Sequence, residues 1–137
     1  MVTNEWHEDG PPVTVEDIAA AERAIGVRFP AALRAFYLEH NGGSPVDSAP
    51  HPLGVHGYEP LGTRGDLVQL HGDLSEISDE ARAFIPFAYD AGGASFLAPS
   101  ADDPDPRPAL FFVDGGDLER IDHPLEALLP PGRSSAR

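Results

Sequence analysis

Apolar residues between Thr14 and Gly43 recur every three or four positions, which is the spacing of two short amphipathic helices. The first helix is predicted to carry one apolar stripe, made of Ile18, Ala21 and Ile25. The second is predicted to continue at the same spacing, through Leu33, Phe36, Tyr37 and His40. Neither helix is long enough to be stable alone in water, so both must dock their apolar faces on another element.

Local signals predict where the two helices begin and end. Thr14 and Asp17 have the spacing of a capping box, in which each side chain accepts a hydrogen bond from the other residue's backbone N–H. Gly26 supplies the left-handed residue that commonly ends a helix, and Pro30 fits the first position of the second helix. The run EHNGG at residues 39–43 then stops the second helix.

Apolar runs separated by glycine and proline turns predict a meander of strands after the helices. The runs are residues 55–61, 84–89, 94–98, 109–113 and 118–121. Glycine and proline within the first run restrict it to a sheet edge. Pro86 has no N–H to donate, so its nitrogen must face an unpaired side of its strand or a bulge.

The remaining segments are less regular. Residues 64–77 have leucines at helical spacing, but Gly65 and Gly72 interrupt the pattern. Residues 124–129 predict a last helical turn or two, and residues 99–108 a loop that its prolines stiffen. Residues 1–12 and 130–137 are expected to be flexible ends, with Trp6 filling a gap at the edge of the core.

Helices first, strands in the middle and a short closing helix are typical of an α+β domain. The sequence therefore predicts a single domain over residues 1–137. In this domain the N-terminal helix pair packs on one face of a mostly antiparallel sheet of about four to six strands, and a short helix closes the chain. A chain of 137 residues is long enough to bury a core without disulfides or metals.

The net charge of the chain indicates which kinds of partner it can bind. Nine basic residues, all of them arginine, stand against 23 acidic residues and give a net charge of −14. Such a field repels nucleic acid phosphates and favours association with a basic partner. The chain has no cysteine, no apolar run long enough for a membrane span and no signal-peptide pattern. We therefore expect a cytoplasmic protein that binds neither nucleic acid nor membrane.

Candidate catalytic and metal-binding residues form no recognisable motif. His51, His56, His71 and His123 are scattered without the paired spacing of a zinc site. Residues 102–105 lack the regular spacing of a calcium loop. Nucleophile-elbow and phosphate-binding glycine motifs are also missing. We therefore expect no catalytic residue, no metal site, no cofactor and no enzymatic activity.

Two motifs carry a resemblance to a known family. A capped helix followed by IGVRFPAALRAFY and EHNGG ends at residue 43, and FIPFAYDAGGASFLA follows at residues 84–98. This order resembles the SMI1/KNR4 family of the SUKH superfamily, which contains bacterial immunity proteins and eukaryotic regulators. The resemblance implies the same α+β arrangement. The chain departs from the family pattern at residues 125–129, where a longer apolar closing helix is usual.

Acidic residues gather on the turns and loops that follow the predicted strands. They are Asp90, Asp102, Asp103, Asp105, Asp114 and Asp117. If the strands pair in sequence order, turns after alternate strands lie at the same end of the sheet, and some of these carboxylates form one partner-binding surface. A tight complex also needs aromatic anchors, for which Tyr58 and Tyr89 are candidates, although both also suit the core.

Three functions are compatible with these features. The leading hypothesis, for which the resemblance supplies the word immunity, is an immunity protein that neutralises a cognate toxin, with a basic nuclease as a fitting target. The second is a regulatory or scaffold module of the kind that the eukaryotic members of the family imply. The third is a small metal-dependent hydrolase that would use His71, Asp73 or His123.

Overall fold

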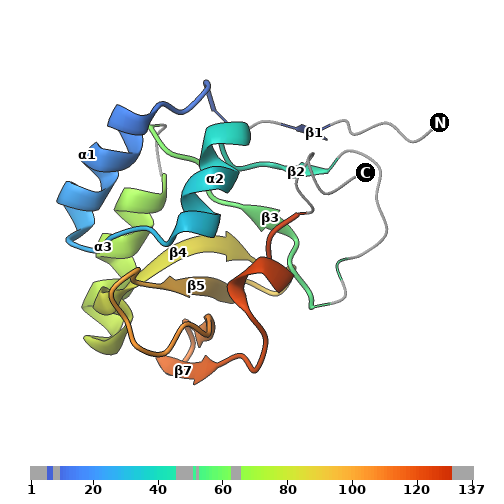
Figure 1. Cartoon of the computed structure of the whole chain (residues 1–137). Coiled ribbons are helices and arrows are strands. Elements are labelled where there is room, and N and C mark those ends of the chain that lie inside the picture. The colour runs from blue at the N-terminus through green and yellow to red at the C-terminus, as the bar shows by residue number, and fades with distance from the viewer. Residues whose placement is uncertain (1–5, 8–9, 46–50, 52, 63–65, 131–137) are drawn as a thin grey trace.

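The computed structural model describes residues 6–7, 10–45, 51, 53–62 and 66–130. Within these residues the chain forms three α-helices and a five-stranded antiparallel sheet, which confirms the predicted α+β class (Figure 1). The helices are α1 (Val15–Ile25), α2 (Ala31–Glu39) and α3 (Leu67–Ile77). α3 packs on strand β4 (Phe84–Tyr89), α1 packs on α3, and α2 packs on α1.

The helix pair begins and ends close to where the sequence predicts. The capping box is formed, because the Thr14 N–H donates to Asp17 Oδ2 at 2.9 Å and the Asp17 N–H donates to Thr14 Oγ1 at 3.1 Å. Gly26 adopts a φ of 74° and ends α1. Pro30 is the N-cap residue of α2, one position before the place predicted for it. Local capping chemistry therefore determines these boundaries.

The sheet is a meander whose strands pair in sequence order. Its strands are β3 (Gly57–Tyr58), β4, β5 (Ser95–Pro99), β6 (Ala109–Phe112) and β7 (Asp117–Arg120). β3 is the first strand in this order, as expected of an edge strand, although it is shorter than the predicted run. The register of β4 on β5 shifts between Pro86 and Ala88, which confirms the irregularity expected beside the proline.

A second, two-stranded sheet joins the N-terminal segment to the end of the helix pair, and the sequence pattern did not predict it. β1 (Trp6–His7) pairs antiparallel with β2 (Ser44–Pro45). The Trp6 indole donates a hydrogen bond to Gly42 O at 2.7 Å and stacks on His40 with ring centroids 4.3 Å apart. Trp6 therefore packs at the edge of the core, as predicted.

α3 differs from its prediction, because it runs through Gly72 without interruption. A glycine inside a helix costs about 1 kcal/mol relative to alanine. The buried side of α3, with Leu67 and Leu74, offsets this cost by packing in the core. Asp66 caps the helix by accepting a hydrogen bond from the Gln69 N–H at 3.1 Å. Gly65, the other predicted breaker, lies outside the described residues.

The predicted closing helix is a 3-10 turn, η2 (Leu125–Ala127). Leu125 and Leu128 are buried in the larger of the two apolar clusters of the core. The Tyr58 hydroxyl, also buried, donates to Leu128 O at 2.6 Å and ties this turn to the sheet. Tyr58 is therefore a core residue and not a surface anchor.

Replacing Gly43 by alanine is expected to destabilise the fold more than the same change at Gly54. Both glycines have a φ of 92°, so both substitutions carry the left-handed backbone cost of about 1–2 kcal/mol. At Gly43 the added methyl group would also overlap the carbonyl oxygen of His7 and lie 2.8 Å from Nε1 of Trp6, whereas nothing lies within 4 Å at Gly54. Urea unfolding measures both losses, and equal losses would contradict the packing of β1 on Gly43.

Candidate functional site

The six aspartates predicted to bind a partner divide between two ends of the sheet. Because β4 to β7 pair antiparallel in sequence order, the β4–β5 and β6–β7 turns lie at one end and the β5–β6 loop lies at the other. The first end carries Asp90, Asp114 and Asp117, and the second carries Asp102, Asp103 and Asp105. The two groups also differ in what their carboxylates contact.

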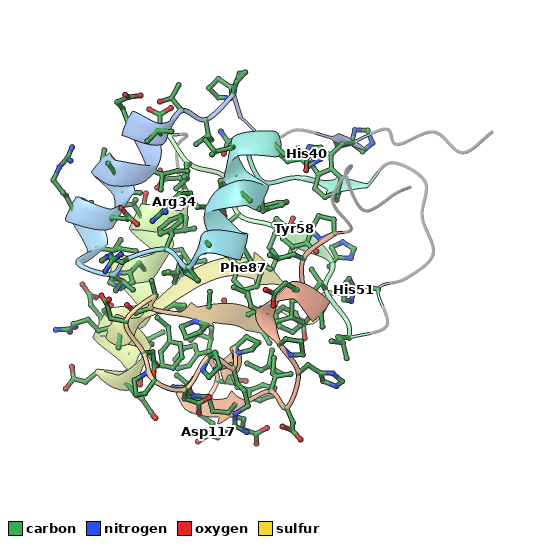
Figure 2. All side chains as sticks on the ribbon, viewed as in Figure 1. Arg34, His40, His51, Tyr58, Phe87 and Asp117 are labelled. Atoms are coloured by element: carbon green, nitrogen blue, oxygen red, sulfur yellow. The ribbon has the colours of Figure 1, made fainter. Side chains whose placement is uncertain are left out.

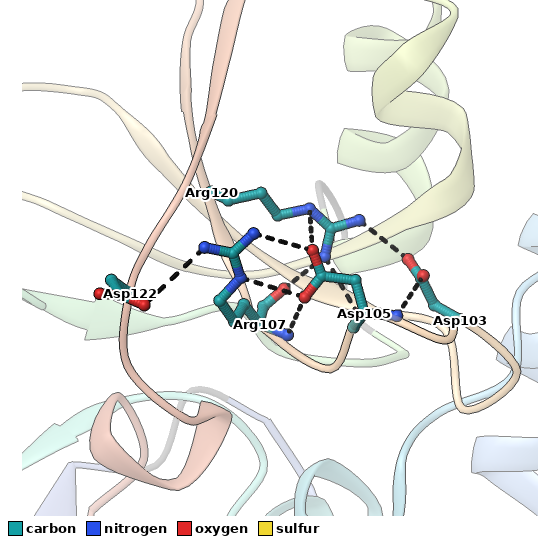
Figure 3. A network of polar contacts seen from close by, with 5 residues as sticks. All are labelled: Asp103, Asp105, Arg107, Arg120 and Asp122. Carbon is teal, nitrogen blue, oxygen red and sulfur yellow. Dashed lines mark hydrogen bonds and ion pairs between the residues drawn. The ribbon is translucent and has the colours of Figure 1, made fainter.

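At the second end, arginines hold the aspartates of the loop (Figure 3). Arg107 binds Asp105 through Nε and Nη2, at 3.1 and 3.0 Å. Arg120, in β7, binds Asp103 through Nη2 at 3.0 Å and donates from Nη1 to the carbonyl oxygen of Arg107 at 2.6 Å. Its guanidinium carbon also lies 4.8 Å from the centre of the Phe84 ring. These contacts fasten the β5–β6 loop to β7.

The same contacts keep the loop carboxylates ionised in acid. Hydrogen bonds from the side chain and the backbone of Arg107, aided by the charge of Arg120, lower the pKa of Asp105 to about 2. A hydrogen bond from the Asp105 N–H, together with Arg120, lowers the pKa of Asp103. Because each of these negative charges has an arginine beside it, the loop presents little net charge to a partner.

Two further aspartates of the predicted site are engaged within the fold. Asp102 forms an ion pair with Arg28, in the corner between α1 and α2, at 2.8 Å. Asp90 closes the β4–β5 turn, because its Oδ1 accepts hydrogen bonds from the N–H groups of Gly92 at 2.9 Å and Ala94 at 2.8 Å. The first contact joins the loop to the helices, and the second shapes the turn.

Asp114 and Asp117 are different, because neither has an ion pair within the described residues. Both are exposed, and they lie on either side of the β6–β7 turn. Large apolar side chains are exposed beside them: Phe112 at 37%, Val113 at 45% and Ile77, the last residue of α3, at 46%. A Cβ at Gly116 would lie 3.4 Å from Ile77 Cγ2, so the end of α3 abuts this turn.

We call this region the α3–hairpin surface. It consists of Asp73, Glu76, Ile77, Phe112, Val113, Asp114 and Asp117. The three residues from α3 are exposed and lie on one side of the helix, because they are three and four positions apart. Figure 2 shows Asp117 at the lower margin of the molecule, away from α1 and α2. Four carboxylates thus accompany three exposed apolar side chains.

Sequence reasoning identified two carboxylates of this surface but missed its apolar residues. The sequence pattern predicts one strand over residues 109–113, and alternation along a strand sends Phe111 and Phe112 to opposite faces. Phe111 is fully buried in a cluster with Leu74 of α3. Alternation along the strand is therefore the sequence signal that one of the two phenylalanines is exposed. It does not tell which one, because the position of α3 decides which side chain is buried.

A pocket of about 500 Å³ lies between the N-terminal ends of α1 and α3. Its polar groups hold the fold together. Asp17 and Asp66 cap the two helices, and Asn41 donates from Nδ2 to Leu61 O at 2.9 Å. Apolar walls, including Val13 and Val68, make up much of the rest. Asp17, Asp66 and Asn41 therefore already have structural contacts.

The residues of the hydrolase hypothesis are not brought together as a catalytic group. His71 is buried, and its Nε2 lies 2.8 Å from Arg82 O. Asp73 is exposed on another side of α3, since residues two apart do not share a helix face, and His123 is exposed after β7. Among the residues that the structure describes, no group of three or more His, Cys, Asp or Glu side chains is placed to hold a metal ion.

Replacing Asp105 by asparagine is expected to lower stability at neutral pH and to weaken the acid dependence of unfolding. Folding lowers the pKa of Asp105 from 3.8 to about 2. Its contribution is therefore present above pH 3.8 and is lost as the pH falls towards 2. Urea unfolding at several pH values measures both effects, with Asp117→Asn, which removes no ion pair among the described residues, as the control. An acid dependence equal to that of the wild type would contradict a stabilising Arg107 contact.

Comparison with known proteins places the chain in a family. The model of the SMI1 / KNR4 family (SUKH-1) matches residues 12–129, from just before α1 to just after η2. No curated protein and no solved structure matches the chain. Within the described residues, no helix has the length and apolar character needed to cross a membrane. Since the family match covers most of the sequence, the chain belongs to the SMI1/KNR4 family (SUKH-1).

Proposed function

We propose that this protein is an immunity protein, which binds a toxin domain made by the same bacterium and blocks its activity. Membership of the family supports a protein-interaction or immunity-type role, and the net charge of −14 supports a basic target. A nuclease fits, because surfaces that bind nucleic acid carry arginine and lysine for the phosphates. The observation that carries the proposal is the α3–hairpin surface, where carboxylates that form no ion pair with any described residue accompany exposed apolar side chains.

The distribution of arginine supports this proposal. Of the six described arginines, five form ion pairs at other places in the fold: Arg28, Arg34, Arg82, Arg107 and Arg120. None of these pairs includes a carboxylate of the α3–hairpin surface. These five arginines therefore neutralise carboxylates elsewhere in the described part of the chain and not those of this surface.

Inhibition in this proposal results from occupation of the toxin and not from chemistry. Long-range attraction between opposite charges raises the association rate, and the contacts made after docking set the dissociation rate. Over the cationic cleft of a nuclease, the bound carboxylates would take the place of substrate phosphates. The toxin would then be blocked for as long as the complex lasts.

Co-expression with the toxin encoded beside its gene tests the proposed function. We expect the protein to restore growth of cells that make the toxin and to elute with the toxin as one complex from gel filtration. An unrelated acidic protein of similar size is the control for charge alone. Continued killing without a complex would contradict the proposal, and a gene neighbourhood without a toxin would favour the regulatory or scaffold function.

Association of the complex is expected to slow steeply with added salt. The Debye length shrinks from about 10 Å at 0.1 M to about 3 Å at 1 M ionic strength, so the attraction is screened. We expect the association rate constant to fall at least about tenfold over this range, and the dissociation rate constant to change less. Stopped-flow fluorescence measures both constants. An association rate that does not depend on salt would be incompatible with electrostatic steering.

A further inference from the structure

The proposed function does not specify which surface of the protein binds the toxin, but the structure favours one surface. We infer that the toxin docks on the α3–hairpin surface, an inference that rests on the proposed function. Apolar anchors are supplied by Ile77, Phe112 and Val113, and the neighbouring carboxylates form a charged rim. The partner that fits this surface is a basic protein with an apolar depression bordered by arginine or lysine.

The apolar side chains of this surface border one turn, because Phe112 and Val113 directly precede Asp114 and a Cβ at Gly116 would lie 3.4 Å from Ile77 Cγ2. Five large apolar residues are exposed in the part of the chain that the structure describes, and Ile77, Phe112 and Val113 are three of them. The other two, Val15 and Leu38, lie apart on α1 and α2. Binding energy at protein interfaces comes mostly from a few anchors that become buried together. A cluster around one turn can supply such anchors, whereas single exposed residues are ordinary.

The register of the hairpin holds Phe112 away from the core. Phe111 pairs with Leu118 and is buried, so alternation turns Phe112 to the other face, opposite Asp117. The turn is closed by the Gly116 N–H, which donates to Phe112 O at 3.0 Å. Because the hairpin is already formed, docking on it costs little ordering of the backbone.

The carboxylates of the rim determine the charge of the partner. Asp73, Glu76, Asp114 and Asp117 are exposed, and none has an ion pair within the described residues. Two copies of this chain meeting through the surface would bring like charges together, which disfavours self-association. A partner with arginine or lysine around the contact would instead be attracted and oriented.

The β5–β6 loop at the other end of the sheet is the second acidic region with which the α3–hairpin surface can be compared as a docking site. It carries as many aspartates, but Asp102, Asp103 and Asp105 are each paired with an arginine. No large apolar residue is exposed among residues 100–108. A partner would have to break those ion pairs and would gain little apolar contact, so charge and burial both favour the α3–hairpin surface.

Toxin binding by matched apolar variants tests the assignment. The double variant Phe112→Ala/Val113→Ala is expected to weaken the complex at least about tenfold, mainly through faster dissociation. Leu38→Ala is the matched control, because Leu38 and Val113 are both 45% exposed, and it is expected to change affinity by less than about twofold. Unfolding midpoints close to that of the wild type would separate lost contacts from a lost fold.

Charge variants test the rim separately. Asp114→Arg/Asp117→Arg is expected to slow association about tenfold, because it reverses two charges at the contact. The control Asp102→Asn removes a carboxylate at the other end of the sheet and is expected to change the association rate by less than about twofold. If wild-type protein protects cells while all hairpin variants bind as tightly as it does, the docking surface is wrong and the proposed function stands.

A titration without the toxin distinguishes failure of the proposed function from failure of the proposed docking surface. If the wild-type protein neither protects cells nor binds the toxin, the proposed function fails, and a synthetic peptide of alternating arginine and leucine still probes the surface. We expect its addition to shift amide NMR resonances of residues 73–77 and 112–117. Shifts concentrated at residues 101–107, or along α1 and α2, would overturn the assignment of the α3–hairpin surface.

Discussion

Antiparallel pairing of β4 to β7 in sequence order is the constraint on which the rest of the molecule depends. It sends alternate turns to opposite ends of the sheet and alternate side chains to opposite faces. The first effect separates the arginine-held β5–β6 loop from the β6–β7 hairpin. The second puts buried Phe111 next to exposed Phe112. A slip of one residue in β6 would exchange these two side chains, burying Phe112 and exposing Phe111.

Charge and apolar contact act over different distances at the proposed docking surface. The net charge of −14 acts over roughly a Debye length and selects a basic partner before contact. Apolar anchors act only after contact, when water leaves the interface. The hairpin can present both charged and apolar side chains in fixed positions, because Phe111 and Leu118 pack it against the core with Leu74 of α3. A surface held in this way can expose apolar groups without losing its shape.

Much of the fold was predictable from the sequence, because the signals are local. Thr14, Asp17 and Gly26 act on backbone groups within a few residues, so the limits of α1 follow from their neighbours alone. The irregularity beside Pro86 follows from its missing N–H. The order of helices and strands follows from apolar periodicity. The same reasoning failed at Gly72, where core packing of α3 outweighs the local preference of glycine.

The sequence by itself determined that the chain is an acidic α+β domain with carboxylates at its turns. Only the tertiary structure decided which of the described carboxylates form ion pairs with arginine, because such pairing depends on residues far away along the chain. Asp102 meets Arg28 across 74 positions, and Asp103 meets Arg120 across 17. The pairing of β1 with β2 is non-local for the same reason. Exposure of Phe112 depends likewise on where α3 packs, and no spacing within a strand specifies that.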